Sequence, residues 1–231
     1  MLAPDAYIRW INHHLGFNPR SQAASNALAD FILEDLTRDC PSLRRALRSG
    51  VLVARKNAPV RTTVAERDVD LVLCEETHEL PRLRLAVENK TIMAAHGKAR
   101  KNRYGDIIAY ANHVHNHRAD CIAGSVLVIN HSSEYENPDA FAKGLKRPRL
   151  DMDRLVSDTV QLFANIPLRD TTGQSFELPE ALAVIVLEYD GVRPAKLLKK
   201  PPAPRASEHY HYAAFMRRLC ELHGKRFGGR G

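Results

Sequence analysis

The chain has 231 residues, of which 44% are hydrophobic and 26% are charged, close to the average of globular proteins and unlike a disordered chain. We predict one domain over residues 1–231, because this length suits a single well-buried core. The 34 Lys and Arg against 27 Asp and Glu give a formal charge of +7, which favours a polyanionic partner. No apolar stretch reaches the roughly 18 residues of a membrane helix, and the first residues lack the layout of a signal peptide, so we expect a cytoplasmic protein without a membrane partner.

Cofactor and metal motifs of several common kinds are missing from the sequence. Neither a P-loop nor a dinucleotide fingerprint occurs, so we expect no nucleotide cofactor. His113, His115 and His117 alternate along a predicted helix, where residues two apart diverge, so we expect no zinc site from them. The cysteines are scattered without a CxxC pair, which predicts buried free thiols at Cys40, Cys74, Cys121 and Cys220.

The hydrophobic pattern predicts alternating helices and strands. In chain order these are a helix at 22–40, strands at 51–54, 69–74 and 83–90, a helix at 98–117, a strand at 122–129, a helix at 153–164, a strand at 182–189 and a helix at 207–222. Ser21 or Ser25 is a suitable N-cap for the first helix, and Ser207 for the last. This order predicts an α/β fold, with a central mixed β-sheet of about five strands and helices on both faces.

Polar and proline-containing segments separate the predicted elements. Pro41 ends the first helix, and a polar turn around Asn57 and Pro59 separates the first two strands. The first three strands need only short links, so we expect them to form a meander. We predict loops at 131–149 and 191–206 and a flexible tail at 224–231.

Charged residues interrupt the second and third apolar strands. Asp70 lies between Val69 and Leu71, and an uncompensated carboxylate in a buried strand is costly. Glu88 and Lys90 are two residues apart on a strand and therefore share a face. Phosphodiester hydrolysis needs neutralised phosphate charge and an activated water, which a hard divalent cation held by carboxylates can provide. These residues are therefore candidates for a Mg²⁺-dependent catalytic site.

Asp70, followed after 17 residues by Glu88-Asn89-Lys90, resembles the signature of the PD-(D/E)XK nucleases. Val69 stands where the name of the motif has proline. The order of helix, three-stranded meander, helix and strand over about 22–130 also looks like the core of that family. The resemblance implies a restriction-endonuclease-like fold.

The resemblance also implies roles for individual residues. Asp70 and Glu88 would bind Mg²⁺ together with the backbone carbonyl of Asn89. Lys90 would orient or deprotonate the attacking water, or stabilise the phosphate at the transition state. Family members often add an acidic ligand from the first helix, and Glu34 is the preferred candidate here.

Two further acidic residues are rivals within this assignment. Asp30 lies one helical turn before Glu34 and shares its face, so it is the second candidate for the helix ligand. Asp68 is two residues before Asp70 on the same strand and competes for its role. The non-functional alternative for the whole set of charged residues is a surface ion-pair cluster that contributes little to stability.

Basic residues follow the motif at the start of the next predicted helix. A helix N-terminus attracts phosphate, which would place DNA beside the metal site, although these charges are also typical of a solvated helix face. The predicted DNA-binding residues are His96, Lys98, Arg100, Lys101 and Arg103, with Lys143, Arg147 and Arg149 in the following loop.

The leading functional hypothesis is a type II restriction endonuclease that cuts both strands of double-stranded DNA. Recognition of a palindromic site would imply a homodimer. One alternative keeps the fold and changes the substrate to branched DNA, as in a repair nuclease or junction resolvase. Another is a non-catalytic DNA-binding protein.

Overall fold

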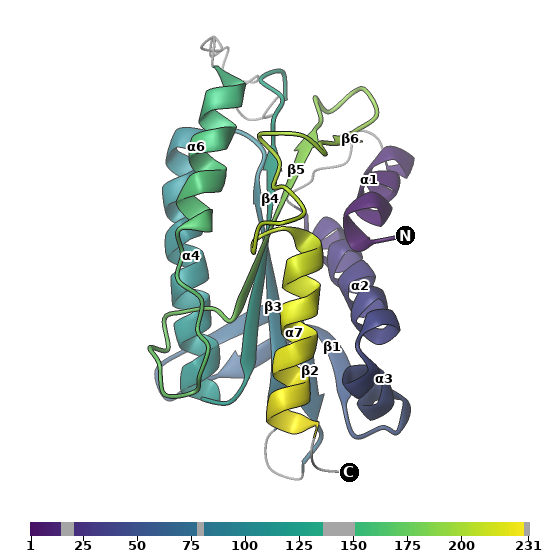
Figure 1. Cartoon of the computed structure of the whole chain (residues 1–231), viewed down its shortest axis with the longest axis vertical. Helices are drawn as coiled ribbons and strands as arrows, with labels where there is room; N and C mark the ends of the chain where they lie inside the picture. The colour runs from purple at the N-terminus through teal and green to yellow at the C-terminus, as the bar shows by residue number, and fades with distance from the viewer. Residues whose placement is uncertain (15–20, 78–80, 136–150, 229–231) are drawn as a thin grey trace.

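The computed structural model describes residues 1–14, 21–77, 81–135 and 151–228, arranged around a six-stranded sheet (Figure 1). The strands are β1 (Val53–Arg61), β2 (Glu66–Glu75), β3 (Arg82–Ile92), β4 (Ile122–Asn130), β5 (Ala181–Glu188) and β6 (Lys196–Leu197). The helices are α1 (Ala3–His13), α2 (Gln22–Asp39), α3 (Pro41–Arg48), α4 (His96–His117), α6 (Met152–Ala164) and α7 (Tyr212–Phe227). Within these ranges, no helix has both the length and the apolar character that crossing a membrane requires.

The strands follow one another across the sheet in the order β1-β2-β3-β4-β5-β6. β1, β2 and β3 pair antiparallel, which confirms the predicted meander. β3, β4 and β5 are parallel, and α4 makes the crossover between the first two of them. The short β6 pairs antiparallel with β5. The predicted α/β class and mixed sheet are therefore confirmed, and β6 is the strand that the prediction lacks.

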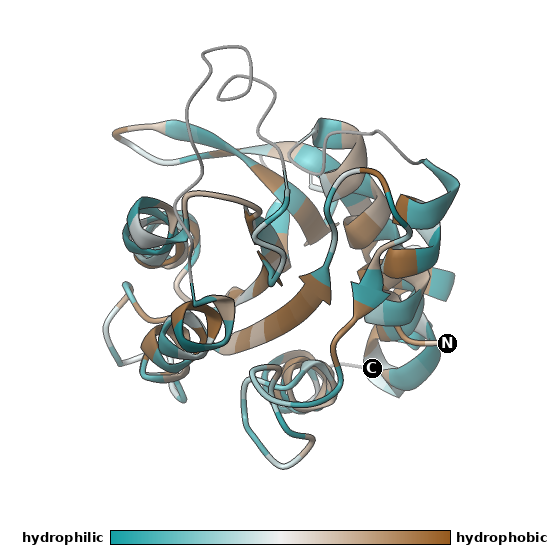
Figure 2. Ribbon diagram, turned by 90° about the horizontal axis from the view of Figure 1, so that it is seen from above, coloured by the Kyte–Doolittle hydropathy of each residue, from teal (hydrophilic) through white to brown (hydrophobic). Residues whose placement is uncertain are grey.

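Helices cover both faces of the sheet, with α4 and α6 on one side and α1, α2, α3 and α7 on the other (Figure 1). The central strands are buried on both sides. On β4, Val126 and Val128 pack in the core beneath α7, whereas Leu127 and Ile129 pack in the core beneath α6. Seen from above, the central strands are largely hydrophobic, whereas the projecting hairpin and the outward sides of the helices carry hydrophilic residues (Figure 2). Continuous apolar runs are typical of strands that are covered on both faces.

Several element boundaries differ from the prediction near proline and asparagine. α2 ends at Asp39, just before Pro41, as predicted. Pro41 also begins α3, which the prediction lacks, because the N–H that proline lacks would have no helical partner in the first turn. Asn57 and Pro59 lie inside β1, where the prediction places a turn. Asn57 has a φ of 48°, which asparagine tolerates better than most residues, and Pro59 lies on an edge strand.

The helix ends are decided by caps. Ser21, not Ser25, caps α2 by accepting a hydrogen bond from the backbone of Ala24. α7 begins at Tyr212 with His211 as its cap, so the prediction of a start capped by Ser207 is wrong. The same helix continues to Phe227, so residues 224–227 are helical and not part of a flexible tail.

The cysteines divide into a bonded pair and two free thiols. Cys40, between α2 and α3, forms a disulfide with Cys220 of α7, with the two Cα atoms 5.2 Å apart. The prediction of free thiols is wrong for this pair, whose members are 180 residues apart and meet through the packing of α3 on α7. Cys74 and Cys121 are free and buried, as predicted.

Two of the three histidines near the end of α4 contact β1, and the third lies on another side of the helix. His113 and His117 donate to the backbone carbonyls of Val60 and Arg61 on β1, at 2.7 and 2.6 Å. His115 is buried on another side of the helix. The side chain of His115 therefore diverges from those of its two neighbours, as the helical spacing predicts.

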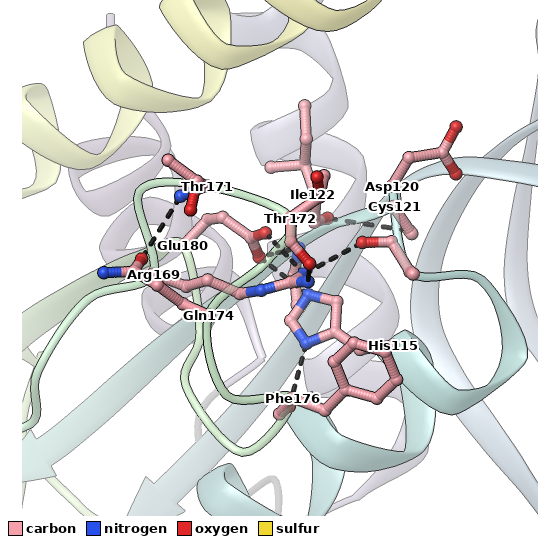
Figure 3. A network of polar contacts seen from close by, with 12 residues as sticks. His115, Asp120, Cys121, Ile122, Arg169, Thr171, Thr172, Gln174, Phe176 and Glu180 are labelled. Carbon is pink, nitrogen blue, oxygen red and sulfur yellow. Dashed lines mark hydrogen bonds and ion pairs between the residues drawn. The ribbon is translucent and has the colours of Figure 1, made fainter.

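A buried charge network joins α4, β5 and α7 (Figure 3). Glu180, directly before β5, accepts hydrogen bonds from His115 at 2.9 Å, Arg169 at 3.2 Å and Arg226 at 2.9 Å. Burial alone would raise the pKa of Glu180. The pKa is nevertheless held below its usual value by the hydrogen bond and charge of His115, by the hydrogen bond from the Ala123 N–H and by the charge of Arg226. This carboxylate is therefore a compensated structural charge.

We expect Glu180→Gln to lower the free energy of unfolding at pH 7 by about 3–5 kcal/mol, because it leaves buried cationic partners without their counter-charge. Since the pKa of Glu180 is lowered in the folded state, its contribution is present above the usual value of 4.5 and is lost as the pH falls through the folded pKa. Urea unfolding at several pH values measures both effects. The control is Glu177→Gln, whose side chain is exposed, and equal stability of the two variants would contradict the prediction.

Candidate active site

β2 and β3 place two carboxylates next to each other. The antiparallel ladder pairs Leu71 with Val87, so the next position along it carries Asp70 on one strand and Glu88 on the other. The backbone N–H of Asn89 donates to Oδ2 of Asp70 at 2.7 Å, which fixes this carboxylate against β3. The adjacent antiparallel strands thus bring together the first two residues of the predicted site.

β2 changes its buried face at Asp70. Val69 packs in the core beneath α4, whereas Leu71 packs in the core beneath α2, so the strict alternation expected of this strand is interrupted between them. The ladder with β1 is interrupted at the same level, where Asn57 adopts its positive φ. As a result, the side chain of Asp70 reaches α2, where the hydroxyl of Ser25 donates to Oδ1 at 2.6 Å.

The surroundings of Asp70 work against its ionisation. Burial raises the pKa of Asp70, and the negative charge of Glu88 raises it further. Hydrogen bonds from Ser25 and from the backbone of Asn89, together with the charge of Lys90, offset only part of this rise. Asn89 also links β3 to α2, because its side-chain amide donates to the backbone carbonyl of Ser25 at 3.3 Å.

Glu88 is 3% exposed and has its hydrogen-bond donors on one oxygen only. Oε1 accepts hydrogen bonds from Nζ of Lys90 and, at 2.9 Å, from the guanidinium of Arg67. Oε2 is buried and has no hydrogen-bond partner among the residues that the structure describes. The contact between Glu88 and Lys90 confirms that these two side chains share a face of β3.

The two carboxylates fit a hard divalent cation. Magnesium takes oxygen ligands, commonly one or two carboxylates with water and phosphate oxygens completing its shell. Oε2 of Glu88 has no competing donor among the described residues, and the pKa of Asp70 is raised by burial and by the nearby negative charge of Glu88. No group of three His, Cys, Asp or Glu side chains suited to a metal occurs in the described part of the chain.

The other acidic candidates lie elsewhere. Glu34 is exposed on α2, nine residues beyond Ser25 and therefore about 13 Å further along the helix axis. Asp30 forms an ion pair with Lys56 on β1 at 2.7 Å. Asp68 is exposed, and it is Asp70 that contacts β3. The structure therefore brings Asp70 and Glu88 together without Glu34 in the same group.

The basic residues at the start of α4 differ in their exposure. Lys98 and Lys101 are exposed and Arg100 is half-buried, so they are accessible to a ligand. Arg103 donates to the backbone carbonyl of Thr91 on β3 at 3.2 Å. It also forms an ion pair with Asp106, one turn later on α4. Lys143, Arg147 and Arg149 lie outside the described residues.

His96 is buried, in contrast to the exposed basic residue that DNA binding requires. Its Nε2 lies 2.6 Å from the backbone carbonyl of Asn130, at the end of β4. Burial lowers the pKa of His96 below its usual value, although the contact with Asn130 opposes this. The side chain links α4 to β4 and is buried, so the predicted contact of His96 with DNA is wrong.

Comparisons with protein-family models, with curated proteins and with solved structures give no match for this chain. Assignment of a function therefore depends on the geometry of the site and on the order of the elements that form it.

Two residues of the site are absent from the sequence prediction. The sequence prediction names Ser25 only as a possible helix cap, and it assigns no role to Arg67. The spacing of Ser25 four residues after the cap Ser21 places it one turn into α2, but nothing in the sequence shows that this turn faces Asp70. The contact of Arg67 with Glu88 depends on the register in which β2 pairs with β3, which the sequence does not reveal.

We expect Asp70→Asn to increase the free energy of unfolding of the metal-free protein at pH 7. The pKa of Asp70 is raised in the folded state, so its ionised form destabilises the fold above that pKa, and the cost disappears as the pH falls towards the usual value of 3.8. The gain from the neutral amide should therefore be present at pH 7 and absent below 3.8. Chemical denaturation at several pH values measures it. Asp68→Asn, an exposed change on the same strand, is the control, and a loss of stability at pH 7 in Asp70→Asn would refute the expectation.

Proposed function

We propose that the protein is a magnesium-dependent endonuclease that hydrolyses phosphodiester bonds in double-stranded DNA, of the type II restriction kind. The observation that carries this proposal is the placement of Asp70 against β3, where the charge of Glu88 raises its pKa, together with the contact of Lys90 with Glu88. The order α2, β1-β2-β3 meander, α4 and parallel β4 supports a restriction-endonuclease-like core around them.

The residues of the site have complementary roles in this proposal. Asp70 and Glu88 would hold Mg²⁺, with the backbone carbonyl of Asn89 as a further ligand. When bound, the ion neutralises charge on the scissile phosphate and activates the attacking water. Lys90, whose side chain is 19% exposed beside Glu88, either orients or deprotonates that water or stabilises the charge of the phosphate.

DNA would approach along the N-terminal part of α4. The exposed Lys98 and Lys101, with Arg100 between them, carry positive charge on the helix that directly follows the catalytic strand. The formal charge of +7 favours the same partner. For a palindromic site, two copies of the chain would act as a homodimer, each cutting one strand, on DNA in the cytoplasm.

We expect Glu88→Ala and Lys90→Ala each to reduce the nicking of supercoiled plasmid with Mg²⁺ by at least about 100-fold, while the protein stays folded. Each change removes a charge that the proposed reaction needs at the phosphate or at the ion. Agarose gels measure nicking, and circular dichroism checks the fold. Lys225→Ala, an exposed change on α7, should cleave as the unmodified protein does, and normal cleavage by either site variant would remove the site assignment.

The type of DNA substrate can be decided by offering linear duplex and branched DNA side by side. Digestion of a large linear DNA with Mg²⁺ should yield discrete fragments, whose end sequences would identify the cut site. Cleavage confined to branched DNA would instead assign the protein to the repair nucleases or resolvases. Binding of DNA without cleavage by any divalent ion would contradict the nuclease proposal.

A further inference from the structure

Arg67 contacts the proposed site although it belongs to no part of the predicted motif. It lies on β2, three residues before Asp70, and its guanidinium donates to Oε1 of Glu88 at 2.9 Å. The side chain of Arg67 is 27% exposed, whereas that of Glu88 is 3% exposed. This is an ion pair with one buried partner, and it is screened by solvent less than a surface pair.

The donors around Glu88 are distributed unevenly over its two oxygens. A carboxylate can accept about four hydrogen bonds, two on each oxygen. Lys90 and Arg67 both donate to Oε1, and Oε2, which is buried, receives none from the described residues. The side chains of Lys90 and Arg67 therefore share Oε1 of Glu88 and leave Oε2 without a donor among the described residues.

The contact between Arg67 and Tyr110 constrains the guanidinium. Its central carbon lies 5.8 Å from the centre of the Tyr110 ring, which is fully buried on α4. Aromatic rings attract guanidinium groups, which are also less strongly hydrated than ammonium groups. Arg67 is thus placed between an aromatic ring and a carboxylate, so its charge stays close to Glu88.

The formal charges of the site cancel only when Arg67 is counted. Asp70 and Glu88 contribute two negative charges, and Lys90 and Arg67 contribute two positive charges. Without Arg67 the same group would carry one net negative charge. A divalent cation that binds Glu88 meets the repulsion of the guanidinium, which opposes its binding.

We propose that Arg67 is a charge-balancing residue that holds Oε1 of Glu88 and competes with the divalent cation for this carboxylate. The inference rests on the proposed function, because it assumes the metal site of Asp70 and Glu88. In this proposal, Arg67 lowers the cation affinity of the DNA-free protein below the affinity that the two carboxylates and Lys90 alone would give.

The test measures binding of Mn²⁺ alone, without DNA, by electron paramagnetic resonance or calorimetry. Arg67→Met keeps an apolar chain beside Tyr110 and removes the charge, and we expect it to bind Mn²⁺ more tightly. The expected gain is on the order of tenfold, which is what Coulomb's law gives for one unit of charge a few ångströms from a divalent ion in a high-dielectric site. Arg67→Lys keeps the charge and should stay near the affinity of the unmodified protein.

The matched control is Arg61→Met. Arg61 lies on the neighbouring β1 and pairs with Glu66, so its loss changes the net charge equally without touching Glu88. Its Mn²⁺ affinity should be unchanged. A purely structural role of Arg67 would lower the melting temperature of Arg67→Met and leave its affinity unaltered, and Arg67→Gln provides a second neutral variant for the same comparison.

The outcomes separate this inference from the proposed function. Unchanged or weaker Mn²⁺ binding by the folded neutral variants, with binding abolished by Asp70→Asn, would overturn the role of Arg67 and leave the metal site standing. Binding that Asp70→Asn does not affect, or no binding by the unmodified protein, would overturn the metal site and the inference together. Tighter binding by Arg67→Met but not by Arg61→Met supports the inference.

Discussion

The candidate site of this protein depends on the burial of two neighbouring carboxylates. Asp70 and Glu88 have like charges on adjacent strands, in a place where burial already disfavours ionisation, and the pKa of Asp70 is raised for both reasons. Each carboxylate is stabilised by a different element. Ser25 of α2 and the backbone of β3 donate to Asp70, whereas two cations converge on one oxygen of Glu88. The arrangement leaves Oε2 of Glu88 without a hydrogen-bond donor among the described residues.

The fold contains a second buried carboxylate that provides a comparison. Glu180 is fully buried and accepts hydrogen bonds on both oxygens, from two arginines, a histidine and a backbone N–H, and its pKa is lowered. Glu88 is nearly as buried, but its Oε2 has no partner among the described residues. A carboxylate with all its partners stabilises the scaffold, whereas one with a free oxygen, next to a residue of raised pKa, is typical of a functional site.

Strand periodicity predicts the side-chain faces of β3 at the site but not those of β2. The shared face of Glu88 and Lys90 follows from the period of a strand and is confirmed by their contact. The face of Asp70 could not be obtained in the same way, because β2 switches its buried side at that residue. Ser25, and not Glu34, is the α2 residue that contacts Asp70, because Glu34 lies nine residues further along the helix.

Hydrophobic periodicity and local spacing were enough to determine the α/β class, the mixed sheet and the meander, and to predict that Glu88 and Lys90 share a face of their strand. These features depend on residues close together in the chain, whose geometry follows from the helix and strand periods. Only the tertiary structure decided which donors reach each carboxylate, that Cys40 meets Cys220, and that His96 is buried. Such contacts join residues distant in sequence, and they depend on how whole elements pack, which no local pattern encodes.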